Sequence, residues 1–215
     1  MTKPGSLVSG SLGDLLEQLA SDSPAPGGGA AAAVSIAMAA GLVAMAGRFS
    51  SKQLSDHGSL VAEADALRAR VTPLADADAD AYAAVLAALS LPKEPDAKAR
   101  ADLVRKALSD AADVPLEMVE VAADVAWLAG RLAREGNSNL RGDAVTASTL
   151  SSAGARAAAL LVAENLVRMP DDPRSSRASD LARLTEEVAS STVAFVTSAA
   201  ADRTQKEKRR QQECP

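Results

Sequence analysis

Residues Ser23–Gly47 read SPAPGGGAAAAVSIAMAAGLVAMAG and contain no charged side chain. The prolines and glycines break any preceding helix, and alanine is the strongest helix former, so we expect a long helix from Gly27–Gly29 to about Gln53. Small residues recur every four positions along it and predict a smooth seam for a neighbouring helix: Gly29, Ala33, Ala37 and Gly41. A bulkier stripe runs beside the seam, formed by Val34, Met38, Leu42, Met45 and Phe49. We expect both faces of this helix to be buried.

The rest of the chain continues the same pattern. Hydrophobic residues make up 47% of the 215 residues and aromatic residues only 2%, and few stretches alternate in polarity as strands do. Further helices are expected over residues 12–20, 59–88, 96–135 with a kink at Val114–Pro115, 142–168, and from 179 towards the C-terminus. The sequence therefore predicts an all-α, single-domain helical bundle over residues 1–215, with about five to six helices, two of them long.

Charge and cysteine content exclude several classes of protein. The formal net charge is -5, which argues against a nucleic-acid surface, since such a surface needs clustered Lys and Arg. The basic run at Lys206–Arg210 is interpreted as a solvated helix end that complements the helix dipole. With Cys214 as the one cysteine and His57 as the one histidine, neither a disulfide framework nor a Cys/His zinc site is expected.

The uncharged stretch at Ser23–Gly47 also raises the question of a membrane span. It is mostly Ala and Gly with few bulky apolar residues, so a helix buried in a bundle explains it better than insertion into lipid. The start of the chain, Met1–Gly10, lacks a basic region followed by an apolar core, so no signal peptide is expected. These features predict a cytoplasmic protein without a membrane partner.

Asp78 interrupts an apolar helix face. At about 100° per residue, one narrow sector contains Asp78 together with Leu60, Leu67, Val71, Leu74, Val85 and Leu89. Asp76 and Asp80 point to the other side. A carboxylate buried alone costs several kcal/mol or has its pKa raised. Asp78 is therefore either hydrogen-bonded to a facing helix, or a general acid/base or counter-ion for a cationic substrate.

Two further polar residues interrupt a face of the helix expected over 142–168. Asp143 lies in its first turn, where a carboxylate also stabilises the helix dipole without any catalytic role. Asn165 shares the face of Asp143, but the 22 positions between them correspond to about 33 Å. The two can serve one site only if other helices or a second subunit complete it.

The turn Gly27–Gly29 presents free backbone N–H groups at a helix start. Such groups suit a carboxylate or a phosphate. The alternative is that the glycines serve tight packing only.

Taken together, these motifs resemble the cyclodeaminase/cyclohydrolase family, which includes the C-terminal domain of formiminotransferase-cyclodeaminase and stand-alone methenyltetrahydrofolate cyclohydrolases. The matching segments occur in order along most of the chain: Ser23–Ala30, Asp76–Tyr82, Leu91–Lys93, Gly136–Asp143 and Asn165–Leu166. The resemblance implies an all-α bundle that forms a homodimer through helix faces. It also implies a one-carbon derivative of tetrahydrofolate as substrate, with no metal or redox cofactor.

The resemblance also suggests roles for the polar residues. Cyclodeaminases eliminate ammonia from 5-formiminotetrahydrofolate, and cyclohydrolases add water to the cationic methenyl compound; the lack of a formiminotransferase domain favours the second. A carboxylate can stabilise this cation or move protons, which suits Asp78 first and Asp143 second. The expected substrate-binding residues are Gly27, Gly28, Gly29, Lys52, Lys93, Asn137, Asn139, Arg141 and Asn165. Lys52, Lys93 and Arg141 could equally be solvated surface groups.

Three positions depart from the family's pattern. Ala30 stands where a serine follows the glycines, Gly142 where a serine often precedes Asp143, and Leu161 where an asparagine is common. Losing these polar groups could change the substrate or abolish activity. The alternative to an enzyme is thus a non-catalytic folate-binding bundle, or a purely oligomeric one, in which Asp78 is a buried structural acid.

Overall fold

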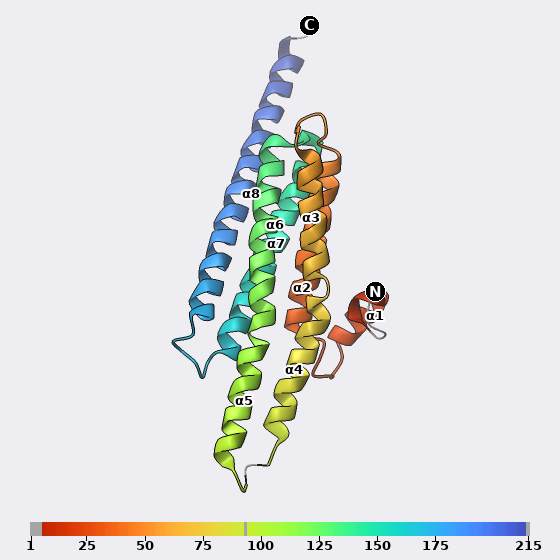
Figure 1. The fold of residues 1–215 in the computed structure, drawn as a ribbon. Helices are drawn as coiled ribbons and strands as arrows, with labels where there is room; N and C mark the ends of the chain where they lie inside the picture. Colours follow the sequence, from red (N-terminus) through yellow and green to blue (C-terminus); the bar gives the residue numbers. More distant parts are fainter. Residues whose placement is uncertain (1–5, 93, 214–215) are drawn as a thin grey trace.

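The structure is a computed structural model that describes residues 6–92 and 94–213, and every regular element in these two ranges is helical (Figure 1). In chain order the elements are η1 (Leu7–Ser9), α1 (Leu12–Leu19), α2 (Gly28–Arg48), α3 (His57–Val71), α4 (Leu74–Ser90), α5 (Ala97–Ala111), α6 (Asp113–Glu135), η2 (Ser138–Leu140), α7 (Arg141–Asn165) and α8 (Pro173–Glu213). The expected all-α bundle is confirmed.

Several helix boundaries differ from the prediction. The helix expected over 59–88 is divided into α3 and α4 at Thr72–Pro73, because proline has no N–H to continue the helical ladder. The break between α5 and α6 falls at Ala112, close to the expected kink. Helix α2 ends at Arg48 rather than near Gln53, and the hydroxyl of Ser50 donates back to the carbonyl of Ala46 in the turn that follows.

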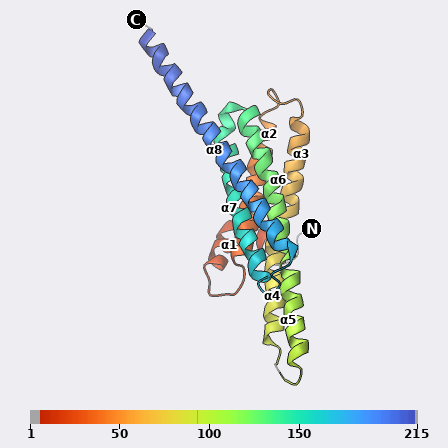
Figure 2. The same cartoon turned by 90° about the vertical axis from the view of Figure 1, so that its left-hand side faces the viewer.

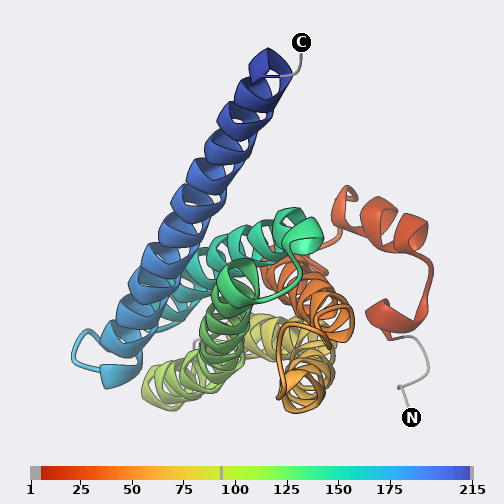
Figure 3. The same cartoon turned by 90° about the horizontal axis from the view of Figure 1, so that it is seen from above.

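Helices α2, α6 and α7 form the centre of the bundle. Helix α3 packs against α2, and α8 packs against α6 and α7 (Figures 1 and 2). The α4–α5 hairpin extends beyond one end of the bundle and α8 beyond the other. The N-terminal helix α1 stands beside the bundle rather than in its core (Figure 3). It is held there partly by the Leu7 N–H, which donates to Asp76 Oδ1 at 2.7 Å.

Small side chains set the spacing between the central helices. Along α2 the seam residues Gly29 and Ala33 are buried, while Ala37 and Gly41 are half-buried. On the facing helix α7, a Cβ placed on Gly154 would lie 2.5 Å from Ile36 Cγ1. The two helices can therefore approach this closely only because residue 154 has no side chain.

The bulkier stripe on α2 is not buried within one chain, so that expectation is wrong for the single subunit. Val34, Leu42 and Met45 are half-buried, Met38 is 49% exposed and Phe49 is 64% exposed. Helix α2 therefore presents one uncharged, apolar face that no other part of residues 6–92 and 94–213 covers fully. By length and composition α2 and residues 138–165 could each cross a membrane, but core helices of soluble proteins meet the same criterion.

We predict that Gly154→Ala lowers the free energy of unfolding by about 1–3 kcal/mol, because the added methyl group overpacks the contact with Ile36. Gly142→Ala is the matched control on the same helix, since a Cβ there meets no atom within 4 Å. Urea denaturation of both variants measures the difference. Equal stability of the two variants would show that the α2–α7 contact is not limited by this glycine.

Candidate active site

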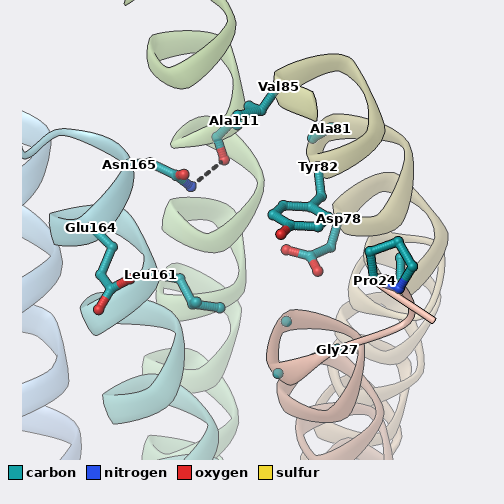
Figure 4. A pocket seen from close by; sticks show the side chains of 13 residues that line it. Pro24, Gly27, Asp78, Ala81, Tyr82, Val85, Ala111, Leu161, Glu164 and Asn165 are labelled. Atoms are coloured by element: carbon teal, nitrogen blue, oxygen red, sulfur yellow. Dashed lines mark hydrogen bonds between the residues drawn. The ribbon is translucent and has the colours of Figure 1, made fainter. Parts of the chain in front are cut away.

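One cavity lies where the N-terminal end of α2, helix α4 and the C-terminal ends of α5 and α7 meet (Figure 4). Its volume is about 240 Å³. The lining residues are Pro24, Ala25, Gly27, Gly28, Gly29, Asp78, Ala81, Tyr82, Val85, Ala111, Leu161, Glu164 and Asn165. Ligand pockets usually measure about 300–1,000 Å³, so the cavity suits one part of a larger ligand.

The carboxylate of Asp78 lies directly against the glycine turn. A Cβ built on Gly29 would overlap both carboxylate oxygens of Asp78, so only glycine permits this approach. The backbone N–H of Ala30 donates a hydrogen bond to the same carboxylate. The first turn of α2 therefore faces a negative charge, which is the favourable orientation at a helix N-terminus.

Asp78 has the electrostatic character of a functional acid. Burial raises the pKa of its carboxyl group above the usual value, and the hydrogen bond from Ala30 offsets part of this rise. No Lys or Arg side chain lines the cavity within the described part of the chain. A half-buried carboxylate without a neighbouring cation suits a cationic ligand, or a proton exchanged with a ligand.

The wall opposite Asp78 comes from the last turns of α7. The Asn165 side-chain Nδ2 donates to the Ala111 carbonyl at 3.1 Å, which fixes the amide and joins the ends of α7 and α5. Its Oδ1 remains able to accept a hydrogen bond. Figure 4 shows the Tyr82 ring beside the carboxylate of Asp78, and Glu164 on the far side of the cavity. The sequence prediction gave no role to Tyr82 or Glu164.

The structure thus brings together five of the expected site residues at one cavity: Asp78, Gly27, Gly28, Gly29 and Asn165. It does not bring Asp143 to them. Asp143 is half-buried in the first turn of α7, and the cavity is at the last turn of the same helix.

The other expected binding residues gather at the end of α7 that carries Asp143. Asn137 donates from its backbone N–H to Ser50 Oγ at 3.0 Å and from Nδ2 to the Phe49 carbonyl at 3.2 Å. Asn139 donates its N–H to the side-chain oxygen of Asn137, and Lys52 is exposed in the neighbouring loop.

Arg141, which also lies at this end of α7, contacts both α6 and α8. It donates from Nε to the Ala133 carbonyl at 3.1 Å, and its guanidinium carbon lies 5.4 Å from the centre of the Phe195 ring. Lys93 lies outside the described residues. We call Lys52, Asn137, Asn139, Arg141 and Asp143 the far-end group.

Comparison with known proteins assigns the family. The family described as formiminotransferase-cyclodeaminase matches residues 11–183. The chain belongs to the formiminotransferase-cyclodeaminase family. The match includes the glycine turn, Asp78 and Asn165, and so contains every wall of the cavity.

Members of the formiminotransferase-cyclodeaminase family differ in length. The methenyltetrahydrofolate cyclohydrolase of Methylorubrum extorquens is 38% identical over 164 residues, which cover 73% of this chain and 79% of that protein. The formimidoyltransferase-cyclodeaminase of Mus musculus is 34% identical over 175 residues, but these cover only 32% of its length. The crystal structure of formiminotetrahydrofolate cyclodeaminase from Thermotoga maritima has a TM-score of 0.75 at 25% identity, with 89% of this chain and 96% of that chain covered.

We predict that the effect of Gly29→Ala depends on Asp78. In the native background the added methyl group must displace the carboxylate and should lower the free energy of unfolding by about 1–3 kcal/mol. In an Asp78→Ala background the same change should cost little, which gives a coupling energy of about 0.5–3 kcal/mol in a double-mutant cycle measured by urea denaturation.

Gly28→Ala is the control for this cycle, since a Cβ on Gly28 meets no atom within 4 Å. Its effect should be the same with and without Asp78. Additive effects of Gly29→Ala and Asp78→Ala would contradict the contact.

Proposed function

We propose that the chain is a one-carbon tetrahydrofolate enzyme that hydrates 5,10-methenyltetrahydrofolate to 10-formyltetrahydrofolate. The observation that carries the proposal is the half-buried carboxylate of Asp78, held against the glycine turn in a cavity without a cationic side chain among the described residues. The methenyl group is a delocalised cation, and a fixed carboxylate stabilises such a charge best where water is largely excluded.

The proposed reaction needs one proton acceptor. A water molecule attacks the methenyl carbon while Asp78 accepts one of its protons, and a neutral hydroxylated intermediate forms. The hydroxyl group then loses its proton as the formyl C=O forms, the bond from this carbon to N5 breaks, and N5 takes a proton, so the formyl group stays on N10. One proton is released in total. Asp78 thus acts first by charge and then as a base, and both roles require its ionised form.

Ammonia elimination from 5-formiminotetrahydrofolate is the second candidate. Its supporting observation is the fold of the Thermotoga maritima cyclodeaminase, 96% of which this chain covers. In that reaction N10 attacks the formimino carbon and the amino group leaves as ammonia. Asp78 would act in its protonated form, which its raised pKa favours. The greater sequence identity to the cyclohydrolase makes hydration our first choice.

The three departures from the family's pattern lie at different distances from the cavity. Leu161 lines the cavity, so the loss of an amide there changes the wall that touches a ligand. Ala30 still offers its backbone N–H to Asp78. Gly142 is exposed at the other end of α7. The named relatives are enzymes, so a degenerated bundle is not the favoured alternative.

We propose that the reaction uses no metal and no redox cofactor, since a carboxylate and backbone N–H groups supply the charge and proton transfer it needs. A cytoplasmic location without a nucleic-acid or membrane partner is part of the proposal. The net charge of -5 and the metabolic relatives support it.

We further propose a homodimer in which the bulky stripes of two α2 helices pack antiparallel. The apolar, uncharged face from Val34 to Phe49 supports this, because exposed apolar faces of this kind mark interaction sites. An isologous contact centred between these two residues places Phe49 of one subunit opposite Val34 of the other. The far-end group of one subunit would then approach the cavity of its partner, where Lys52 and Arg141 could bind the glutamyl carboxylates of the substrate.

The activity is tested by following the loss of near-ultraviolet absorbance of 5,10-methenyltetrahydrofolate against the uncatalysed rate. We predict acceleration by the native chain and a fall in kcat of about 10²–10⁴-fold in Asp78→Asn. Because the ionised carboxylate is the active form, kcat should fall as pH decreases through the raised pKa of Asp78, and this limb should be absent in Asp78→Asn. An absence of acceleration would contradict hydration, and ammonia release from 5-formiminotetrahydrofolate would then be measured as the second candidate.

The dimer is tested with Met38→Glu, which places a charge in the middle of the stripe. We predict that this variant dissociates in analytical ultracentrifugation and loses turnover with the dimer. Leu184→Glu is the control, because Leu184 is similarly exposed at 46% but lies on α8. A native chain that is monomeric yet fully active would refute the shared site.

A further inference from the structure

Glu164 is a second carboxylate at the cavity, and the reaction proposed above does not use it. It lies in the last turn of α7 between Leu161 and Asn165, across the cavity from Asp78 and Tyr82 (Figure 4). Its side chain is exposed at the mouth, whereas Asp78 is half-buried. Glu164 therefore meets a ligand at the opposite edge from the reacting group.

The protein itself gives no reason for an acid at this position. No ion pair or side-chain hydrogen bond of Glu164 is found within residues 6–92 and 94–213. An acidic side chain in the last turn of a helix also faces the negative end of the helix dipole, which is unfavourable. The last turn of α7 contains no basic residue that would compensate.

The polar side chains that α7 contributes to the cavity are both hydrogen-bond acceptors towards a ligand. The amide nitrogen of Asn165 is already bonded to Ala111, which leaves Oδ1 free, and the carboxylate of Glu164 has two acceptor oxygens. A ligand edge that fits this wall must present several N–H groups side by side. The pyrimidine edge of a reduced pterin, with a ring N–H next to an exocyclic amino group, has this arrangement.

We propose that Glu164 binds the amino-pyrimidine edge of the substrate's pterin ring through two parallel hydrogen bonds. Such charge-assisted, bidentate pairs fix orientation as well as adding affinity. The ring would span the cavity, with its one-carbon unit directed at Asp78. The identity of the ligand rests on the proposed function, but the role of Glu164 is one of binding and does not depend on which reaction follows.

The negative charge of Glu164 also determines on which side of the cavity the glutamyl tail of the substrate leaves. The glutamyl carboxylates are repelled by Glu164, and a cavity of about 240 Å³ leaves little room beyond a bicyclic ring. The tail should therefore leave the cavity on the side away from the end of α7. Glu164 would thus distinguish the two ends of the substrate by their opposite hydrogen-bonding character and charge.

The test is a binding measurement, so that it stays separate from turnover. Isothermal titration calorimetry of the full-length chain uses two probes that cannot react: tetrahydrofolate, which has the aryl-glutamate tail but no one-carbon unit, and 6-methyltetrahydropterin, which has neither. We expect Glu164→Gln and Glu164→Ala to weaken both by about 10- to 100-fold. Glu63→Gln, on an exposed glutamate of α3 away from the cavity, should leave both affinities unchanged. Because Glu164→Gln preserves the shape of the side chain, it keeps the test valid if the alanine variant is poorly folded.

A second measurement changes the ligand instead of the protein. A tetrahydropterin with a methyl group in place of the exocyclic amino group should bind the native chain more weakly than 6-methyltetrahydropterin does. Glu164→Ala should no longer distinguish the two.

Equal affinities of the native chain and both Glu164 variants for 6-methyltetrahydropterin would overturn the inference. A loss confined to the ligand with the tail would overturn it as well. If the native chain binds the pterin through Glu164 but turns over neither folate substrate, the proposed function fails and this inference stands. If turnover is found and the Glu164 variants bind normally, only the inference fails.

Discussion

The contact between the backbone of Gly29 and the carboxylate of Asp78 determines how the site is built. It fixes the distance between α2 and α4, because any side chain at position 29 would occupy the space of the carboxylate. It also shields Asp78 partly from water, which raises the pKa of its carboxyl group, while the Ala30 N–H offsets part of that rise. One packing constraint therefore sets both the position and the proton affinity of the proposed catalytic group. A substitution that relaxes the packing must change the chemistry too.

The three aspartates of α4 have different surroundings, and only Asp78 makes this contact. Asp76 Oδ1 accepts the Leu7 N–H at 2.7 Å and so connects α4 to the N-terminal segment. Asp78, two residues on, faces the cavity, and Asp80 is exposed. Because residues two positions apart on a helix differ by about 200°, Asp78 points away from the side that Asp76 and Asp80 share. The acidic run is therefore one anchor, one site residue and one exposed group rather than an acidic cluster.

The sequence predicted that Asp78 faces inwards, and the structure places it half-buried at the cavity, although the break at Pro73 was not predicted. Thr72 and Pro73 both keep helical backbone angles, at φ -53, ψ -47 and φ -70, ψ -13, so the apolar face of α3 continues into α4. The all-α fold and the glycine turn followed from local composition. Glu164 was not singled out because its place in the cavity wall depends on what lies across from it, which no periodicity within α7 reveals. The stripe from Val34 to Phe49 was predicted to be buried, since one helix pattern cannot tell a neighbour in the same chain from a second subunit.

The charge of the proposed substrate connects the exposed apolar stripe of α2 with the far-end group. A cavity lined by Asp78 and Glu164 suits the cationic, N–H-rich ring of a methenyl folate and opposes its anionic tail. The tail needs cations, and among the predicted site residues that the structure describes these are Lys52 and Arg141, at the other end of α7. One chain cannot bring them to the cavity, because α7 holds the two ends apart. An antiparallel pairing of two α2 helices can do so. The apolar face of α2 would then be needed for substrate binding as well as for assembly, and loss of the dimer should be felt first as a loss of affinity for the glutamyl tail.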